Sequence, residues 1–183
     1  MVTINSERET ITDNAEKAII ALMNDSLQIE YECQINYPRL LERLATVYSN
    51  EDKRLFTDIK MFTNIKKCNE ESLNHFKENQ NVVKKLGGKP RWHHRDYYKK
   101  TDDILKHMKI LQQLEMDTLG TLLTVNKIIR FLEQQFSSDS ETDERIVRFT
   151  GMKEGIELQI IDEKNHVGII EESIEKLRIT LED

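Results

Sequence analysis

One stretch of the chain, residues 104–132, constrains the fold most, because its seam of inward positions recurs in unbroken steps of four and three. The seam consists of Ile104, Met108, Leu111, Glu115, Thr118, Leu122, Val125, Ile129 and Leu132. This spacing places the side chains on one face of an α-helix and predicts a long amphipathic helix packed against other helices. Glu115 is the only charged residue in the seam. A register marker would more often be Asn or Lys, so we interpret Glu115 as a buried ligand.

Three further segments have the same helical spacing, so the sequence predicts four long helices. They are expected at about residues 7–48, 51–86, 101–136 and 142–181. The low content of glycine (6) and proline (2) is typical of long helices. We therefore predict an all-α protein in which residues 1–183 form one helical bundle domain, long enough to bury a core.

The connection between the second and third predicted helices is too long for a tight turn. Gly87-Gly88, followed by Pro90, ends the second helix where a left-handed cap is needed, and the third begins near Thr101-Asp102-Asp103. About 14 extended residues reach roughly 45 Å at about 3.3 Å each. That distance matches the length of a helix of about 30 residues. A long crossover along the bundle is therefore compatible with the sequence.

Acidic residues and histidines converge on the predicted interior. Glu30 lies on the apolar stripe between Leu27 and Tyr37, and Glu163 interrupts the stripe of the last helix. His75 follows Glu71 by one turn in the second helix, and His166 follows Glu163 by three residues. A carboxylate and an imidazole at this spacing share a helix face and can bind one metal ion. One such pair is weak evidence in a chain with 33% charged residues, but acids from three helices favour a metal site over a solvated acidic face.

Charge and composition exclude several other classes of function. The net charge of −6 and the lack of a dense basic cluster argue against a nucleic-acid partner. The start of the chain is polar and no apolar run approaches about 18 residues, so we expect neither a signal peptide nor a membrane span. Cys33 and Cys68 form no C-x-x-C pair and are expected to be reduced residues of a cytoplasmic protein.

Together these features resemble the ferritin-like superfamily, specifically the rubrerythrin and bacterioferritin kind of di-iron carboxylate four-helix bundle. Glu30, followed seven residues later by Tyr37, is similar to the first helix of that family. The second helix is similar to the family's "E-E-x-x-H … L-G-G-x-P" pattern, in Glu70-Glu71-Ser72-Leu73-Asn74-His75 and Leu86-Gly87-Gly88-Lys89-Pro90. The histidine-to-glycine distance there is the most specific match. The third and fourth helices are matched by Leu114-Glu115 and Asp162-Glu163-Lys164-Asn165-His166-Val167.

The resemblance implies a ferritin-like four-helix bundle with a long crossover between the second and third helices. The metal ligands it implies are Glu30, Glu71, His75, Glu115, Glu163 and His166. Glu163 would bridge two ions, Glu30 and Glu115 would be terminal ligands, and each histidine would hold one position. Tyr37 would hydrogen-bond a ligand carboxylate or donate an electron; a plain core tyrosine is the alternative.

The expected cofactor is iron, in a di-iron or mononuclear centre, with manganese or zinc as alternatives. The expected partners are metal ions together with dioxygen or peroxide. The implied activity is that of a ferroxidase or a peroxidase-like oxidoreductase, which oxidises Fe(II) or reduces peroxide.

One departure from the family pattern leaves a second function open. Ser72 occupies the position three residues before His75, where the family has a bridging glutamate, and Glu71 is rotated from it by about 100°. Three carboxylates then stand where the family has four, which fits a single ion, an asymmetric pair or an inactivated remnant. The alternative is thus a non-catalytic helical-bundle interaction or structural protein with a degenerate metal site. A storage cage is less favoured, because no short fifth helix follows Leu181, and a homodimer or a lone bundle is expected instead.

Overall fold

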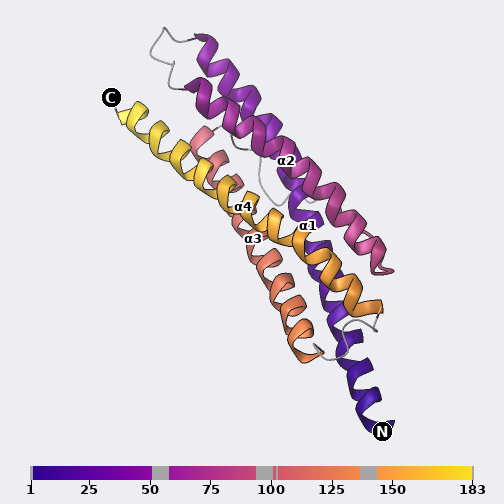
Figure 1. Ribbon diagram of the computed structural model, residues 1–183. Coiled ribbons are helices and arrows are strands. Elements are labelled where there is room, and N and C mark those ends of the chain that lie inside the picture. The colour runs from indigo at the N-terminus through magenta and orange to yellow at the C-terminus, as the bar shows by residue number, and fades with distance from the viewer. Residues whose placement is uncertain (1, 51–57, 94–100, 102, 137–143, 183) are drawn as a thin grey trace.

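The protein is a bundle of four helices. The structure, a computed structural model, describes residues 2–50, 58–93, 101, 103–136 and 144–182. The helices are α1 (Val2–Asn50), α2 (Asp58–Lys85), α3 (Ile104–Gln135) and α4 (Glu144–Glu182) (Figure 1). No strand occurs in these described ranges. The predicted all-α four-helix bundle is confirmed.

The helices form a square in which each has two neighbours. α1 and α4 run in one direction along the bundle, and α2 and α3 run in the other (Figure 1). α1 packs on α2 and α3, while α4 packs on α3 and α2, so α1 and α4 lie on one diagonal. Of the four neighbouring pairs, α2 and α4 pack least closely. All four helices therefore turn one face towards a shared interior.

α2 ends at a left-handed glycine, where the sequence requires one. Gly87 has a φ of 74°, and the N–H of Gly88 donates to the carbonyl of Val83 at 2.9 Å. A Cβ on Gly88 would lie 2.8 Å from Cγ2 of Ile20, so a glycine is needed where the chain passes close to α1. The sequence predicts the start of this helix near residue 51. Residues 51–57 lie outside the described part of the chain, and the described helix begins at Asp58.

A long crossover joins α2 to α3. These two helices run in the same direction, so the chain must return along the bundle between them (Figure 1). The described start of the crossover lies against α1: His93 and Gln28 exchange two hydrogen bonds of 2.7 Å, from the His93 N–H to Gln28 Oε1 and from Gln28 Nε2 to the His93 carbonyl. Farther along α1, the Arg43 guanidinium donates to the carbonyl of Thr101. The predicted long crossover is confirmed.

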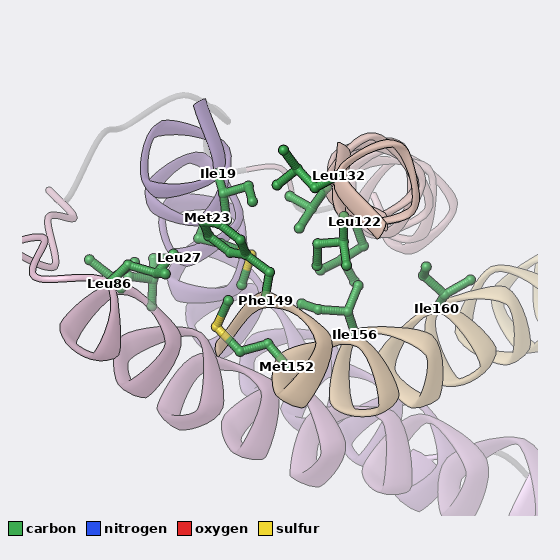
Figure 2. Packing of buried hydrophobic residues seen from close by; sticks show 13 residues of the cluster. Ile19, Met23, Leu27, Leu86, Leu122, Leu132, Phe149, Met152, Ile156 and Ile160 are labelled. Atoms are coloured by element: carbon green, nitrogen blue, oxygen red, sulfur yellow. The ribbon is translucent and has the colours of Figure 1, made fainter. Parts of the chain in front are cut away.

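Two apolar clusters fill the bundle, and each contains residues of all four helices. The first is drawn in Figure 2 and includes Ile19, Met23, Val83, Leu122, Phe149 and Ile156. The second includes Tyr37, Leu40, Ile65, Met108, Leu111 and Ile170. Between them along α1 and α3 lie the buried carboxylates Glu30 and Glu115. A polar layer thus separates two apolar halves of the interior.

Two further expectations can be compared with the fold. In the described part of the chain, no helix combines the length and the apolar character that crossing a membrane requires. Cys33 and Cys68 are buried free thiols, in keeping with their interpretation as reduced core residues.

Candidate metal centre

The polar layer gathers acidic and imidazole side chains from all four helices. α1 contributes Glu30, α2 contributes His75, α3 contributes Glu115, and α4 contributes both Glu163 and His166. None of the five is more than 3% exposed. Each lies on the apolar stripe of its helix or beside it, so burying the stripe carries the polar group into the interior. These five groups must pair with one another or bind an ion, because burying unpaired charges is costly.

Two groups of three side chains lie close enough to hold a metal ion each. One consists of Glu30, His75 and Glu163, and the other of Glu115, Glu163 and His166. Within each group, one ligand atom of every residue lies within 4.8 Å of the others. Glu163 belongs to both groups, so one carboxylate could contact ions at both positions.

The Nδ1 atoms of the two histidines face the carboxylates. His75 Nδ1 lies 2.8 Å from Glu163 Oε1 and 3.7 Å from Glu30 Oε1. His166 Nδ1 lies 3.2 Å from Glu115 Oε2 and 3.7 Å from Glu163 Oε2. The two imidazole rings stack with their centroids 5.9 Å apart. Each ring therefore directs the same nitrogen into its group.

The opposite nitrogen of each ring contacts an outer carboxylate on the other helix. His75 Nε2 lies 3.3 Å from Asp162 Oδ2, and His166 Nε2 lies 3.0 Å from Glu71 Oε2. Glu71 is four residues before His75, as Asp162 is four residues before His166, so the two arrangements mirror one another. A carboxylate at Nε2 fixes the ring and leaves Nδ1 free to bind a metal. Glu71, expected as a ligand, thus lies outside both groups and contacts the far side of an imidazole.

Glu115 is also fixed from the side of α1. The Tyr37 hydroxyl donates to Glu115 Oε1 at 2.5 Å, and Cys33 Sγ lies 3.8 Å from the same oxygen. Burial, followed by the charge of Glu115, raises the pKa of both Tyr37 and Cys33 well above their usual values. Both groups therefore remain protonated donors at neutral pH.

The ionisable side chains of the layer shift one another's pKa values. Burial alone would lower the pKa of both histidines, but hydrogen bonds with carboxylates raise it to about 10 for His75 and about 12 for His166. Burial alone would raise the pKa of Glu115, but its hydrogen bonds with Glu163 and His166 lower it to about 2. Burial and the charges of Glu115 and Glu30 raise the pKa of Glu163 well above its usual value. Without a metal ion, both imidazoles are thus protonated at neutral pH, and the neutral form of Glu163 is favoured.

Two buried carboxylate oxygens test whether the layer suits a metal ion. Glu30 Oε1 and Glu163 Oε2 have no hydrogen-bond partner among the described residues. An unsatisfied buried acceptor costs about 1–3 kcal/mol or more, and a cation would satisfy both atoms. Carboxylate oxygens and imidazole nitrogens are also a donor set that suits iron, manganese and zinc. The residues therefore fit a transition-metal ion.

A solved structure has the same arrangement of helices. It is described as a crystal structure of ferritin like, diiron-carboxylate proteins from Bacillus anthracis str. Ames, and it matches this chain with a TM-score of 0.58 and 19% sequence identity. The match covers 87% of this chain and 97% of that one. The chain has the ferritin-like fold. At this identity the likeness establishes the fold alone; no family model and no curated protein matches the sequence.

Within this ferritin-like bundle, Ser72 occupies the place that mirrors Glu163. Each stands three residues before its histidine. Ser72 is fully buried, and its hydroxyl donates to Glu30 Oε2. The serine therefore supplies a donor to a carboxylate where a second acid would repel it. The bundle keeps its packing here, but the layer is asymmetric, with one shared carboxylate.

Three residues of the polar layer make contacts that the sequence patterns did not assign. Asp162 contacts His75, Cys33 contacts Glu115, and Ser72 donates to Glu30. The spacing from Asp162 to His166 repeats that from Glu71 to His75, and this repeat was the sequence signal for the role of Asp162. Cys33 lies one turn after Glu30 on α1, which was the signal for the role of Cys33.

Proposed function

We propose that this protein binds two transition-metal ions at neighbouring positions that share Glu163. The observation that carries the proposal is the participation of this one buried carboxylate in both candidate groups. In this proposal Glu30 and His75 complete one position, and Glu115 and His166 complete the other. Iron is the preferred ion, as the family resemblance implies. Manganese or zinc are alternatives, because all three accept mixed oxygen and nitrogen ligands.

The proposed reaction is a redox reaction of Fe(II) with dioxygen or peroxide. Bound iron would supply the electrons for reducing the oxidant. The chain's own part is to hold the ligands in place and exclude bulk water: the outer carboxylates orient both imidazoles, and the hydroxyl of Tyr37 orients Glu115. The apolar clusters border the layer on both sides along the bundle and limit its contact with water. The homodimer and the cytoplasmic location remain predictions from the sequence.

Metal stoichiometry tests the binding proposal directly. Chelator-treated protein is dialysed anaerobically against Fe(II), and separately against Mn(II) and Zn(II), and its metal content is measured by elemental analysis. We expect about two ions per chain, and Glu163→Gln should reduce both occupancies because it removes the shared ligand. Glu175→Gln makes the same substitution on the exposed surface of α4 and should retain full binding. A metal content near zero in the unmodified protein contradicts the proposal.

Turnover is tested separately from binding. Protein loaded with Fe(II) is mixed with dioxygen or hydrogen peroxide, while Fe(III) formation and oxidant consumption are recorded. We expect oxidation faster than in a protein-free control, and Glu163→Gln should lose that acceleration. Full metal binding without acceleration would support the proposed metal site and contradict the proposed redox activity.

A second candidate is a structural or interaction bundle with a degenerate metal site. The donor from Ser72 to Glu30 favours it, because it satisfies one ligand oxygen within the protein. The pairs of His75 with Glu163 and of His166 with Glu115 likewise satisfy candidate ligand atoms within the protein. This candidate predicts that Mn(II) or Zn(II) leaves the melting temperature unchanged. The metal proposal predicts a rise, equivalent to about 2.7 kcal/mol when the free ion is at 100 times its dissociation constant.

A further inference from the structure

A groove between α2 and α4 leads to the edge of the polar layer that contains the candidate metal groups. Its volume is about 450 Å³, and its lining includes His75 and Asp162. These belong to the layer itself, since His75 lies in one candidate group and Asp162 holds its outer nitrogen. The groove lies between the two neighbouring helices that pack least closely. The buried layer is thus approached by an open space at one of its own residues.

The charged side chains that line the groove are mainly carboxylates. Glu71 and Glu78 lie on the lining face of α2 one turn to either side of His75, and Asp162 faces them from α4. Lys85 is the one ammonium among the lining residues, against these three carboxylates. A concave, acidic surface concentrates cations relative to bulk solvent. The charge of the lining therefore favours a cation over an anion.

A buried amide in the lining adds a separate indication of a ligand. Gln159 is only 3% exposed, and its Nε2 donates to Glu78 Oε2 at 2.9 Å. Its Oε1 is buried and has no hydrogen-bond partner in the described part of the chain. Since Nε2 already donates to Glu78, the carbonyl oxygen is left to accept from a donor or to bind a cation. Glu78 and Gln159 are thus linked in the lining of the groove, and the amide oxygen of Gln159 has no donor among the described residues.

Gln159 also belongs to a second polar layer, one helical turn from the metal layer. Each helix contributes one residue to it. Ser26 of α1 lies four residues before Glu30, and Asn79 of α2 lies four residues after His75. Thr118 of α3 lies three residues after Glu115, and Gln159 of α4 lies four residues before Glu163. All four are buried. Asn79 donates to Ser26 Oγ at 2.9 Å, while Asn79 Oδ1 and Thr118 Oγ1 have no partner among the described residues. This second layer thus contains further neutral oxygens without a donor among the described residues.

We propose that a divalent transition-metal cation reaches the buried centre through this groove and is held on the way by Glu78 and Gln159. The inference rests on the proposed metal-binding function and adds the path and its first ligands. The carboxylate attracts the hydrated ion, and the amide oxygen replaces part of its hydration shell. Divalent transition-metal cations accept carboxylate and carbonyl oxygens as ligands, Mn(II) most readily.

The rate of metal uptake tests the role of Glu78. Chelator-treated protein is mixed with Co(II) in a stopped-flow instrument, and the visible absorption of the bound ion reports loading of the centre. Glu78→Gln keeps the size of the side chain but removes its charge, and it should slow loading at least about threefold. The final Co(II) content should equal that of the unmodified protein. Glu175→Gln should load at the unmodified rate.

Filling the groove tests the path itself. Gly155 lines the groove, and no atom lies within 4 Å of the place where its Cβ would stand, so a Cβ fits there without a clash. Gly155→Leu should slow loading more than Glu78→Gln does, because it occupies the space through which the ion moves. Gly155→Ala is the matched control, and its loading rate should stay close to the unmodified rate. Helical circular dichroism and melting temperature establish that each variant is folded.

The outcomes separate this inference from the proposed function. Normal loading rates in both Glu78→Gln and Gly155→Leu, with full metal content, would overturn the path and leave the metal centre intact. A reduced final Co(II) content in Glu78→Gln would also overturn it, because Glu78 would then be a ligand of the centre. If the unmodified protein binds no metal, the proposed function fails first.

Discussion

Glu71 of α2 accepts from His166 of α4, with Oε2 and Nε2 3.0 Å apart, although it lies one turn before the other histidine of the layer. Asp162 makes the reciprocal contact with His75. Each of the two helices thus orients the imidazole of the other. This exchange explains why an acid expected as a metal ligand stands outside both candidate groups, and it determines which ring nitrogen faces the interior.

Metal binding should release protons. At neutral pH and without metal, His75 and His166 carry protons because their pKa values are raised to about 10 and about 12, and the raised pKa of Glu163 favours its protonated form. A metal ion requires all three groups deprotonated, so up to one proton should leave from each. Zn(II) titrations by calorimetry, in two buffers of different ionisation enthalpy at one pH, measure the number. Binding should also become tighter as the pH rises, and a buffer-independent heat would contradict this charge assignment.

Ser72→Glu should make the fold depend on metal. The new carboxylate would enter a fully buried position beside Glu30, and without a cation this should destabilise the protein by about 3–5 kcal/mol. Mn(II) or Zn(II) should recover most of the loss, because a fourth acid would then be a ligand. Urea unfolding with and without metal measures both effects.

Ser72→Ala is the control for that substitution. It removes the hydroxyl donor to Glu30 without adding charge and should cost about 1.5–3 kcal/mol, the range for a hydrogen bond to a charged group. Its response to metal should resemble that of the unmodified protein. If Ser72→Glu were as stable as the unmodified protein without metal, Ser72 would not be buried against Glu30.

Tyr37→Phe separates an orienting role from a ligand role. The substitution keeps the ring in the second apolar cluster and removes only the hydroxyl that donates to Glu115. We expect a loss of about 1.5–3 kcal/mol in the free energy of unfolding and an unchanged number of bound ions. Urea unfolding and elemental analysis provide the two values. A lower ion count would make the phenol part of the metal site itself.

The pH dependence of stability should contain a contribution from His107, which lies away from the metal layer. This side chain is 3% exposed, and burial together with the charges of Arg43 and Arg39 lowers its pKa from 6.5 to about 4. Below pH 6.5 the unfolded chain binds a proton that the folded protein does not, so this contribution to stability is lost as the pH falls from about 6.5 to 4.

The variant His107→Leu should lack that loss. The difference in unfolding free energy between it and the unmodified protein should change by at most about 1.4 kcal/mol per pH unit in this window and level off above it. Urea unfolding at a series of pH values measures the difference. A constant difference from pH 4 to 7 would mean that His107 titrates equally in both states.

The arrangement of the helices could be predicted because helical periodicity extends over most of the chain. The seam from Ile104 to Leu132 identifies α3 and its inward face, and Gly87 identifies the end of α2 through the one backbone conformation that favours glycine. Glu30, Glu115 and Glu163 stand out in the same way, because a charge on an apolar stripe must be buried.

The outer parts of the centre could not be predicted, because they depend on contacts between helices. Whether Glu71 reaches its own neighbour His75 or the distant His166 depends on the rotation of α2 against α4, which spacing within one helix does not contain. The partner of Ser72 likewise lies 42 residues away on α1. Cys33 resembles any small core residue until Glu115 is placed beside it.

Each apolar cluster joins all four helices on its own side of the polar layer, so neither half of the bundle needs an ion to hold its helices together. Under the proposed function, newly synthesised chains would fold first and acquire metal afterwards, and removing the metal should loosen the middle of the bundle while both ends stay closed. Such a protein would exist in the cell as a ready receptor, whose occupancy follows the supply of free cation rather than the history of its folding.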